Sequence, residues 1–398
     1  MNISFDNTEN AFAYKSNKHL KMARFLFKTM DNPVLIQLGV RLSPLAIKLG
    51  LPVKGLMRKT IFQQFVGGES LLETAVVGEL LHKYGVKVIL DYGVEGKQGE
   101  ENFEHTTEEF IKVIKYASTK KNIPFISVKV TGIARFALLQ RLNDAPRIRS
   151  GVHDNEAEAE EWERVRDRMY RICDAAAEYN IGVLIDAEES WIQDPVDRLT
   201  MEMMEEFNQD KVIVYNTIQL YRTDRLQFLH MSHRIAQQNK FMLGVKLVRG
   251  AYMEKERERA ASKGYPSPIQ PTKQASDNDY NAAVVFCISQ IADTACIIAT
   301  HNEESNLLAA QLMEKNDLHP DHSHVHFSQL YGMSDNITFN LAKEGFSVSK
   351  YLPFGPINDV IPYLMRRAQE NKSVSGQTGR ELALIEKELK RRKEEGIK

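Results

Sequence analysis

The fold is decided by residues 182–219, which read GVLIDAEESWIQDPVDRLTMEMMEEFNQDKVIVYNTIQ. The stretch opens with a short apolar run, 182–186 (GVLID), that ends in a carboxylate, and it closes with a second run, 212–219 (VIVYNTIQ). The segment between the two runs has helical length and apolar spacing. Strands that alternate with helices lie parallel, because a tight turn cannot join parallel neighbours. The stretch therefore predicts one strand–helix–strand unit of a parallel sheet.

The same pattern recurs from about residue 85 to residue 351 and predicts eight strands. The other six runs are 87–91 (KVILD), 125–129 (FISVK), 242–246 (MLGVK), 296–301 (CIIATH), 325–329 (VHFSQ) and 346–351 (FSVSKY). Eight such units close naturally into a barrel, which leaves no unpaired sheet edge. We therefore predict an α/β fold with a (β/α)8 barrel over 85–375, a helical region over 1–84 and a charged C-terminal helix or tail over 376–398.

Every one of these runs ends at a polar or ionisable residue. In a (β/α)8 barrel the carboxyl ends of the strands meet at the rim that carries the active site. One polar ending is a chance event, whereas eight at one rim indicate a ligand site. The residues are Asp91, Lys129, Asp186, Gln219, Lys246, His301, Gln329 and Tyr351.

The composition excludes several classes of protein. Fifty-two Lys and Arg against 53 Asp and Glu give a formal net charge of −1, which argues against a nucleic-acid partner. Cys173, Cys287 and Cys296 form no CxxC pair, so we expect a reducing compartment and no cysteine zinc site. The first 20 residues lack the features of a secretory signal or a transit peptide. We therefore expect a cytoplasmic protein.

The most apolar stretch, 33–57, is interrupted by charged residues and prolines. No window of it has the roughly 20 apolar residues that cross a bilayer. The stretch is either a pair of short helices packed on the main domain or a segment that lies on a membrane surface.

Four constellations carry possible chemistry, and each has an ordinary structural alternative. Arg366–Arg367 offers two planar forks for a carboxylate or phosphate, or it is a solvated helix end that pairs with Glu370. The turn expected over 352–356 (LPFGP) aims the helix that carries this pair, 357–371. The acidic stretch 186–189 (DAEE) is a base, a metal ligand or a helix cap.

The other two constellations follow later strands. The stretch 246–252 (KLVRGAY) either admits a large planar ligand beside Gly250–Ala251 or is merely a basic turn. The stretch 322–326 (HSHVH) has a spacing that zinc or iron could use, or an alternation of histidines by chance. No HExxH, Walker or G-x-G-x-x-G motif accompanies them.

Six segments resemble the signature segments of the proline dehydrogenase family and occur in the family's order. They are 185–190 (IDAEES), 246–252 (KLVRGAY), 299–302 (ATHN), 327–335 (FSQLYGMSD), 349–356 (SKYLPFGP) and 362–373 (PYLMRRAQENKS). The spacing of Tyr351, Tyr363 and the arginine pair also matches, and 250–281 resembles the monofunctional, mitochondrial-type branch. Many bacterial members carry arginine at the position of Lys246, and the region before about residue 85 matches nothing that can be transferred.

The resemblance implies an FAD-dependent, distorted (β/α)8 TIM barrel whose last helix lies over the barrel mouth. It implies oxidation of L-proline to (S)-1-pyrroline-5-carboxylate by hydride transfer to FAD, the first step of proline catabolism to glutamate. Electrons would pass to a quinone at a membrane surface, which implies peripheral docking on the inner membrane. No metal is expected.

The resemblance also assigns residues. Arg366 and Arg367 would hold the proline carboxylate, Asp91 would support Lys129, and Glu95 would pair with Arg366 as a gate. The substrate pocket would be lined by Lys129, Asp186, Leu330, Tyr351 and Tyr363, with Asp186, Lys129 and Lys246 as catalytic residues. The flavin would be surrounded by Ala187, Gln219, Lys246, Arg249, Gly250, Ala251, Thr272, Lys273, Thr300, His301, Asn302 and Glu370.

Three alternatives stay open at this point. The substrate could be hydroxyproline, which differs from proline by one ring hydroxyl. The protein could be a metal-dependent barrel hydrolase, with ligands from His301, His322, His324, His326 and Asp186. It could also be a barrel that serves only as a binding scaffold, although the polar rim argues against this.

Overall fold

The eight strands form one closed parallel barrel in the order β1 to β8, as the prediction required. The computed structural model describes residues 3–30, 55, 57–93, 98–144, 156–361, 363, 364 and 377–397. The strands are β1 (Lys87–Tyr92), β2 (Phe125–Val128), β3 (Gly182–Ile185), β4 (Val214–Gln219), β5 (Leu243–Val248), β6 (Thr294–Ala299), β7 (Val325–Leu330) and β8 (Val348–Phe354).

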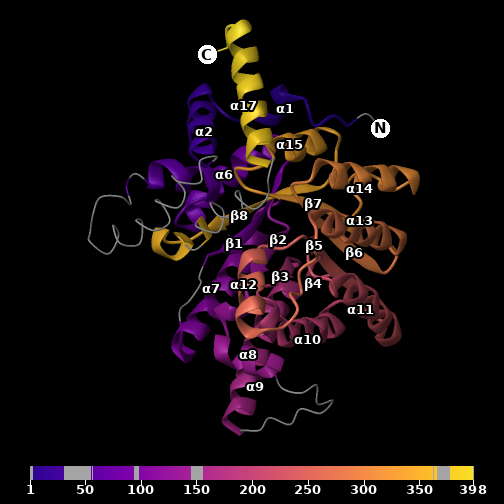
Figure 1. Cartoon of the computed structure of the whole chain (residues 1–398). Coiled ribbons are helices and arrows are strands. Elements are labelled where there is room, and N and C mark those ends of the chain that lie inside the picture. Colours follow the sequence, from indigo (N-terminus) through magenta and orange to yellow (C-terminus); the bar gives the residue numbers. More distant parts are fainter. Residues whose placement is uncertain are drawn as a thin grey trace. The chain divides into compact units, whose positions relative to one another are not determined.

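The chain divides into two compact units, and each contributes strands to the barrel. One unit comprises Met1–Gly93 with Phe327–Lys398, and the other comprises Val94–His326. The domain boundaries predicted from the sequence, at residues 84 and 375, are not tested by this division and stay predictions. Figure 1 follows the chain from the indigo N-terminal helices to the yellow C-terminal helix.

The first unit holds both ends of the chain around one apolar cluster. Phe12, Phe27, Phe65 and Leu384 are buried in this cluster. The C-terminal helix α17 packs against α2 and α1 (Figure 1), so the charged segment is a packing helix rather than a solvated tail. The helices of this unit are α1 (Thr8–Phe12), α2 (Asn17–Met30), the π-helical η1 (Arg58–Phe62), α5 (Gln63–Phe65), α6 (Leu71–His82), α15 (Asp335–Lys343) and α17 (Gln377–Glu394).

The second unit alternates strands and helices as the sequence predicted. Strand β3 pairs with β2 and β4, and β5 pairs with β4 and β6, all in parallel register. Its helices are α7 (Glu100–Ser118), the 3-10 turn η2 (Val130–Gly132), α8 (Phe136–Asp144), α9 (Glu156–Tyr179), α10 (Ser190–Phe207), α11 (Arg225–Asn239), α12 (Met253–Lys263), α13 (Lys273–Ser289) and α14 (Glu303–Lys315).

Several helices of the second unit begin where the sequence provides a cap. The Thr272 hydroxyl accepts a hydrogen bond from the Ala275 N–H at 3.1 Å at the start of α13, and Asn302 Oδ1 accepts one from the Ser305 N–H at 2.8 Å at the start of α14. Such caps satisfy N–H groups that have no partner within the helix. Helix α14 therefore begins just after the carboxyl end of β6, whereas α12 lies between β5 and α13 in the chain.

Two expectations about the strand ends were wrong in detail. Lys246 and Tyr351 lie inside β5 and β8 rather than at their ends. The turn expected over 352–356 begins only after Phe354, because β8 runs through Pro353. Proline lacks an N–H, but the Pro353 carbonyl still accepts a hydrogen bond from the Gly67 N–H at 2.8 Å.

Two segments singled out in the sequence fall largely outside the described residues. These are the apolar stretch 33–57 and the helix expected over 357–371, of which residues 357–361, 363 and 364 are described. The position of that helix over the barrel mouth stays a prediction. Within the described part of the chain, no helix is both long and apolar enough to cross a membrane.

Candidate active site

Three charged side chains from β2, β3 and β5 or the residues that follow them meet in the second unit. Asp186 directly follows β3, Lys129 directly follows β2, and Lys246 lies within β5. Lys129 Nζ lies 3.5 Å from Asp186 Oδ2, and Lys246 Nζ donates to Asp186 Oδ1. The Asp186 and Lys129 side chains are each 12% exposed and Lys246 is 6% exposed. The structure thus places the three predicted catalytic residues together. They are largely buried, and two positive charges face one negative charge.

A second cluster surrounds Arg249, which follows β5. Its guanidinium donates to Asp277 Oδ1 at 2.7 Å and to Thr300 Oγ1 at 2.6 Å, and it lies over the Tyr280 ring. Lys273 Nζ contacts the other oxygen of Asp277 at 2.6 Å. Burial acts to raise the pKa of Asp277, but the hydrogen bonds from Lys273 and Arg249 hold it below its usual value. Asp277 is therefore ionised at neutral pH and fixes both cations.

The backbone between β5 and α12 makes a close approach that only glycine allows. Gly250 has a φ of +142°, and a Cβ there would come within 2.3 Å of the Tyr221 ring. The glycine is thus required by the packing of Tyr221, and the expectation that Gly250–Ala251 admits a large planar ligand stays a prediction. Ala187, Ala251 and His301 are half-buried in the loops that follow β3, β5 and β6.

The first unit places the predicted ring-packing residues together. Leu330 of β7 is in register with Tyr351 of β8, and Leu330 also packs against the buried cluster that contains Tyr363. Asp91 is buried in β1 and in register with Pro353. Four further predicted residues lie outside the described part of the chain: Glu95, Arg366, Arg367 and Glu370.

The histidine segment does not form a ligand cluster. His324 Nδ1 lies 2.7 Å from the Ile291 carbonyl oxygen, while His326 is buried in β7 and packs edge-on against Phe125. Within the described ranges, no group of three or more His, Cys, Asp or Glu side chains is placed to hold a metal ion. The geometry gives the metal-hydrolase alternative no support.

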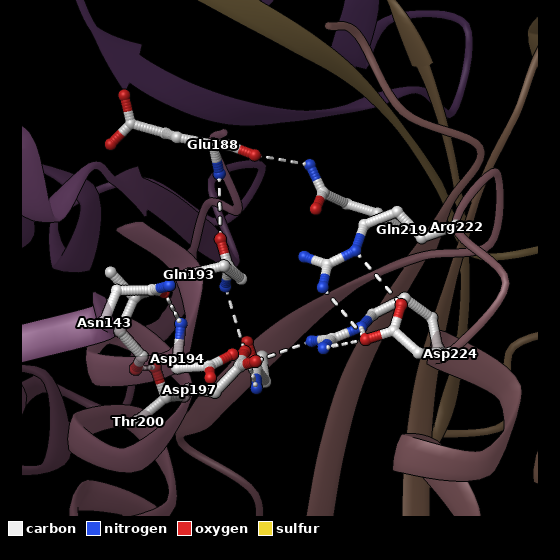
Figure 2. Close-up of polar contacts among 12 residues, drawn as sticks. Asn143, Glu188, Gln193, Asp194, Asp197, Thr200, Gln219, Arg222 and Asp224 are labelled. Atoms are coloured by element: carbon white, nitrogen blue, oxygen red, sulfur yellow. Dashed lines mark hydrogen bonds and ion pairs between the residues drawn. The ribbon is translucent and has the colours of Figure 1, made fainter. Parts of the chain in front are cut away.

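Several residues that hold the loop between β3 and α10 were not predicted from the sequence. Glu256 of α12 accepts hydrogen bonds from both the N–H and the hydroxyl of Ser190, each at 2.6 Å. Glu256 is fully buried, although its helix reads as a solvated charged segment. Gln193 and Asp197 of α10 belong to a buried network behind the same loop (Figure 2). Their partners are distant in the sequence, so no motif spacing could reveal them.

A parallel barrel that gathers charged side chains at the carboxyl ends of its strands is the arrangement of a TIM-barrel enzyme. The sequence profile described as proline dehydrogenase matches residues 77–380. The chain therefore belongs to the proline dehydrogenase family, which is a family of flavoprotein oxidoreductases.

Individual relatives cover most of the chain. The Carbapenem antibiotics biosynthesis protein CarD of Pectobacterium carotovorum subsp. carotovorum is 37% identical over 82% of this chain and 83% of its own length. Proline dehydrogenase 2, mitochondrial, of Arabidopsis thaliana is 33% identical over 92% of this chain and 82% of its own. Hydroxyproline dehydrogenase of Xenopus laevis is 30% identical over 96% and 88%.

Among solved structures, proline utilization A of Bdellovibrio bacteriovorus, inactivated by N-propargylglycine, superposes with a TM-score of 0.71 at 20% identity. The match covers 83% of this chain and 36% of that longer protein. At this identity the likeness shows the fold alone, and the fold is the barrel predicted from the sequence.

Proposed function

We propose that this chain oxidises L-proline to (S)-1-pyrroline-5-carboxylate with FAD as its cofactor. The observation that carries the proposal is the charged cluster of Asp186, Lys129 and Lys246 in a chain of the proline dehydrogenase family. A net positive cluster at the strand ends suits a substrate that carries a carboxylate and must lose its amine proton.

The residues around the strand ends fit a flavin. Gln219 is 2% exposed, and its Oε1 is buried without a hydrogen-bond partner among the described residues. An isoalloxazine ring carries an N–H donor, and its reduced form is anionic, so it suits an amide acceptor flanked by cations. Lys246 of β5 and Arg249, which follows β5, are the candidate cations.

When bound, FAD accepts the hydride that leaves the proline carbon beside nitrogen. The chain's own residues have to bind and orient the substrate at about 3–3.5 Å from the acceptor. Arg366 and Arg367 grip the carboxylate, and Leu330, Tyr351 and Tyr363 pack the ring. Lys129 disfavours a protonated amine nearby and so selects the neutral form, which releases hydride more easily. Asp91 supports Lys129, and Glu95 pairs with Arg366 when the site closes.

The remaining cofactor contacts are proposed for residues that follow β3, β5 and β6 or begin α13, for Gln219 at the end of β4, and for Glu370, which lies outside the described residues. Lys246 and Arg249 stabilise the negative charge of the reduced flavin. The other residues are Ala187, Gln219, Gly250, Ala251, Thr272, Lys273, Thr300, His301, Asn302 and Glu370.

Hydroxyproline is the second candidate substrate. A hydroxyproline dehydrogenase is 30% identical to this chain over nearly its whole length. A site that lacks a dedicated partner for the ring hydroxyl discriminates by only about 10–200-fold. We favour proline because two tyrosines and a leucine pack the ring in the proposed pocket.

The experiment that tests the proposal has two steps. Denaturing extraction of the purified protein should release FAD from a yellow preparation, and steady-state kinetics with an artificial acceptor should show a higher kcat/KM for L-proline than for hydroxyproline. Arg366→Met and Arg367→Met should each raise the KM for proline strongly and leave the flavin content largely unchanged. A colourless protein without FAD, or an unchanged KM in both variants, would overturn the corresponding assignment.

We further propose that a quinone takes the electrons at a membrane surface, reached by peripheral docking from the cytoplasmic side. Residues 33–59 and the basic C-terminal helix are the candidate contacts. Binding to anionic liposomes, compared between the oxidised and the dithionite-reduced protein, tests this. No binding in either state would contradict it.

A further inference from the structure

The loop that carries Asp186 is held from behind by side chains of the helix that follows it. The loop comprises residues 186–189, between β3 and α10. Both backbone polar groups of Glu188 are hydrogen-bonded. The Glu188 N–H donates to Gln193 Oε1 at 3.0 Å, and Gln219 Nε2 donates to the Glu188 carbonyl at 2.8 Å. Figure 2 shows Gln193 directly beneath this peptide.

The orientation of the Gln193 amide is fixed by its second partner. Gln193 Nε2 donates to Asp197 Oδ1 at 2.9 Å, and a carboxylate can only accept. Oε1 must therefore face the Glu188 N–H. Asp197 is itself anchored, because Arg225 Nη1 donates to its Oδ2 at 2.6 Å and Asn216 Nδ2 to its Oδ1 at 3.0 Å. A buried chain of hydrogen bonds thus runs from the loop to α11.

The side chains of this hydrogen-bond network are buried. Gln193 is 1% exposed, and the side chains of Asp197 and Arg225 are 7% and 6% exposed. Water cannot replace a lost partner there, so an unpaired Glu188 N–H would move to find another acceptor. A shift of this peptide would carry Asp186, two residues earlier, away from Lys129 and Lys246.

We propose that Gln193 is a positioning residue for the oxidation, because it fixes the Glu188 peptide and so aims Asp186 between its two lysines. The inference rests on the proposed function for the role of Asp186. It assigns no contact between Gln193 and the substrate or the cofactor. Catalytic geometry has to hold to within about 0.5 Å, which a single buried amide at this place can decide.

The chain offers a control residue on α8 that contacts the helix of Gln193. Asn143 Oδ1 of α8 accepts a hydrogen bond from the Asp194 N–H at 3.0 Å, one residue beyond Gln193. The two contacts are of the same kind and lie near each other (Figure 2), but that of Asn143 does not reach the loop. Asn143 is less buried than Gln193, so it controls for the loss of an amide contact to α10, and hydrogen exchange of the loop separates the two roles.

The test compares Gln193→Met and Asn143→Leu in the holoenzyme. Hydrogen exchange of the peptide that spans residues 186–192 should rise in Gln193→Met and not in Asn143→Leu. The limiting rate constant of anaerobic flavin reduction by L-proline should fall about 10- to 100-fold in Gln193→Met, with a changed pH profile, and stay within about twofold in Asn143→Leu. Unchanged exchange and rate in Gln193→Met, or equal losses in both variants, would overturn the proposal.

A third variant keeps the proposal testable if Gln193→Met does not fold. Gln193→Glu retains the acceptor for the Glu188 N–H, and when protonated it can donate to Asp197. Its rate relative to wild type should therefore rise as the pH is lowered, and a constant ratio would count against the proposal. If the wild-type flavin is not reduced by L-proline, the proposed function fails, whereas the exchange measurement still decides whether Gln193 holds the loop.

Discussion

Each compact unit of the molecule contains an aspartate that is paired with two lysines. In the second unit, Asp186 faces Lys129 at 3.5 Å and also Lys246. In the first unit, Asp335 lies 2.8 Å from Lys15 Nζ and 2.9 Å from Lys350 Nζ. The ionic groups are the same in kind, but their surroundings differ.

The cluster around Asp335 is sealed and supplied with further partners. Its side chain is 2% exposed and Lys350 is fully buried. The Tyr14 hydroxyl donates to Asp335 Oδ2 at 2.9 Å, and Lys350 Nζ donates to the Met333 carbonyl at 2.5 Å. Coulombic attraction and hydrogen bonds from the lysines outweigh burial, which acts in the opposite direction, and lower the pKa of Asp335 to about 2.

The comparison sets a structural ionic cluster against the cluster that we propose to be catalytic. The sealed cluster also includes Glu381 of α17, a second carboxylate that accepts from the Ser334 N–H. The Asp186 cluster is more exposed and lies at the carboxyl ends of β2 and β3, with Lys246 inside β5. Charges that are buried and matched hold helices together, whereas a partly open cluster with excess positive charge can receive an anionic substrate.

The largest expected effect is a loss of folding stability when the sealed cluster is disrupted. Asp335→Asn removes the carboxylate that directly contacts two buried lysines, so the free energy of unfolding should fall by about 3–5 kcal/mol. Urea unfolding followed by circular dichroism measures the loss. Asp186→Asn should lose less, because water reaches Lys129. Equal losses of unfolding free energy in the two variants would contradict the difference between the two clusters.

The next effect concerns the pH dependence of stability. Burial raises the pKa of Glu381 to about 7, whereas an ordinary glutamate titrates near 4.5. The folded state therefore binds this proton more tightly than the unfolded state does. The stabilisation that comes from protonation of Glu381 is complete below about pH 4.5 and is lost as the pH rises through 7. Its upper limit is about 3 kcal/mol.

Glu381→Gln should remove this decline. Urea midpoints measured from pH 5 to 8 should fall with pH in the wild type and stay flatter in the variant. A decline of equal slope in both proteins would mean that Glu381 is not the group that titrates. The same variant should leave the rate of flavin reduction unchanged, since Glu381 belongs to the sealed cluster.

A smaller effect is expected at Lys129 in the open cluster. Lys129→Met removes the positive charge that disfavours a protonated substrate amine, so flavin reduction should slow about 10- to 100-fold and its pH profile should shift. Stopped-flow absorbance over a pH series measures both. The free energy of unfolding should change little, and an unchanged pH profile would remove Lys129 from its proposed role.

Much of the barrel could be predicted because strand and helix periods are local properties of the sequence. The eight apolar runs correspond to β1 to β8. Pro353 misled the prediction of a turn, because a strand needs only its carbonyl at that position. The predicted strand ends differ from the observed ones by a few residues. The fifth run was predicted to end at Lys246, whereas β5 continues to Val248.

The contacts that position the site could not be predicted in this way. Glu256 and Gln193 hold the Asp186 loop through partners set by the fold, and Asp335 meets Lys15 from the opposite end of the chain. The spacing of these residues in the sequence does not indicate which partners they contact. Arg366, Arg367, Glu370 and Glu95 were assigned through family resemblance and stay predictions.

The most direct test measures anaerobic flavin reduction by L-proline in Asp186→Asn and Asp335→Asn side by side, below the unfolding transition of each. The account predicts a fall of at least about 100-fold in Asp186→Asn, which corresponds to about 3 kcal/mol, and a rate within about threefold of wild type in Asp335→Asn. A wild-type rate in Asp186→Asn, or an equal loss in both variants, would contradict it.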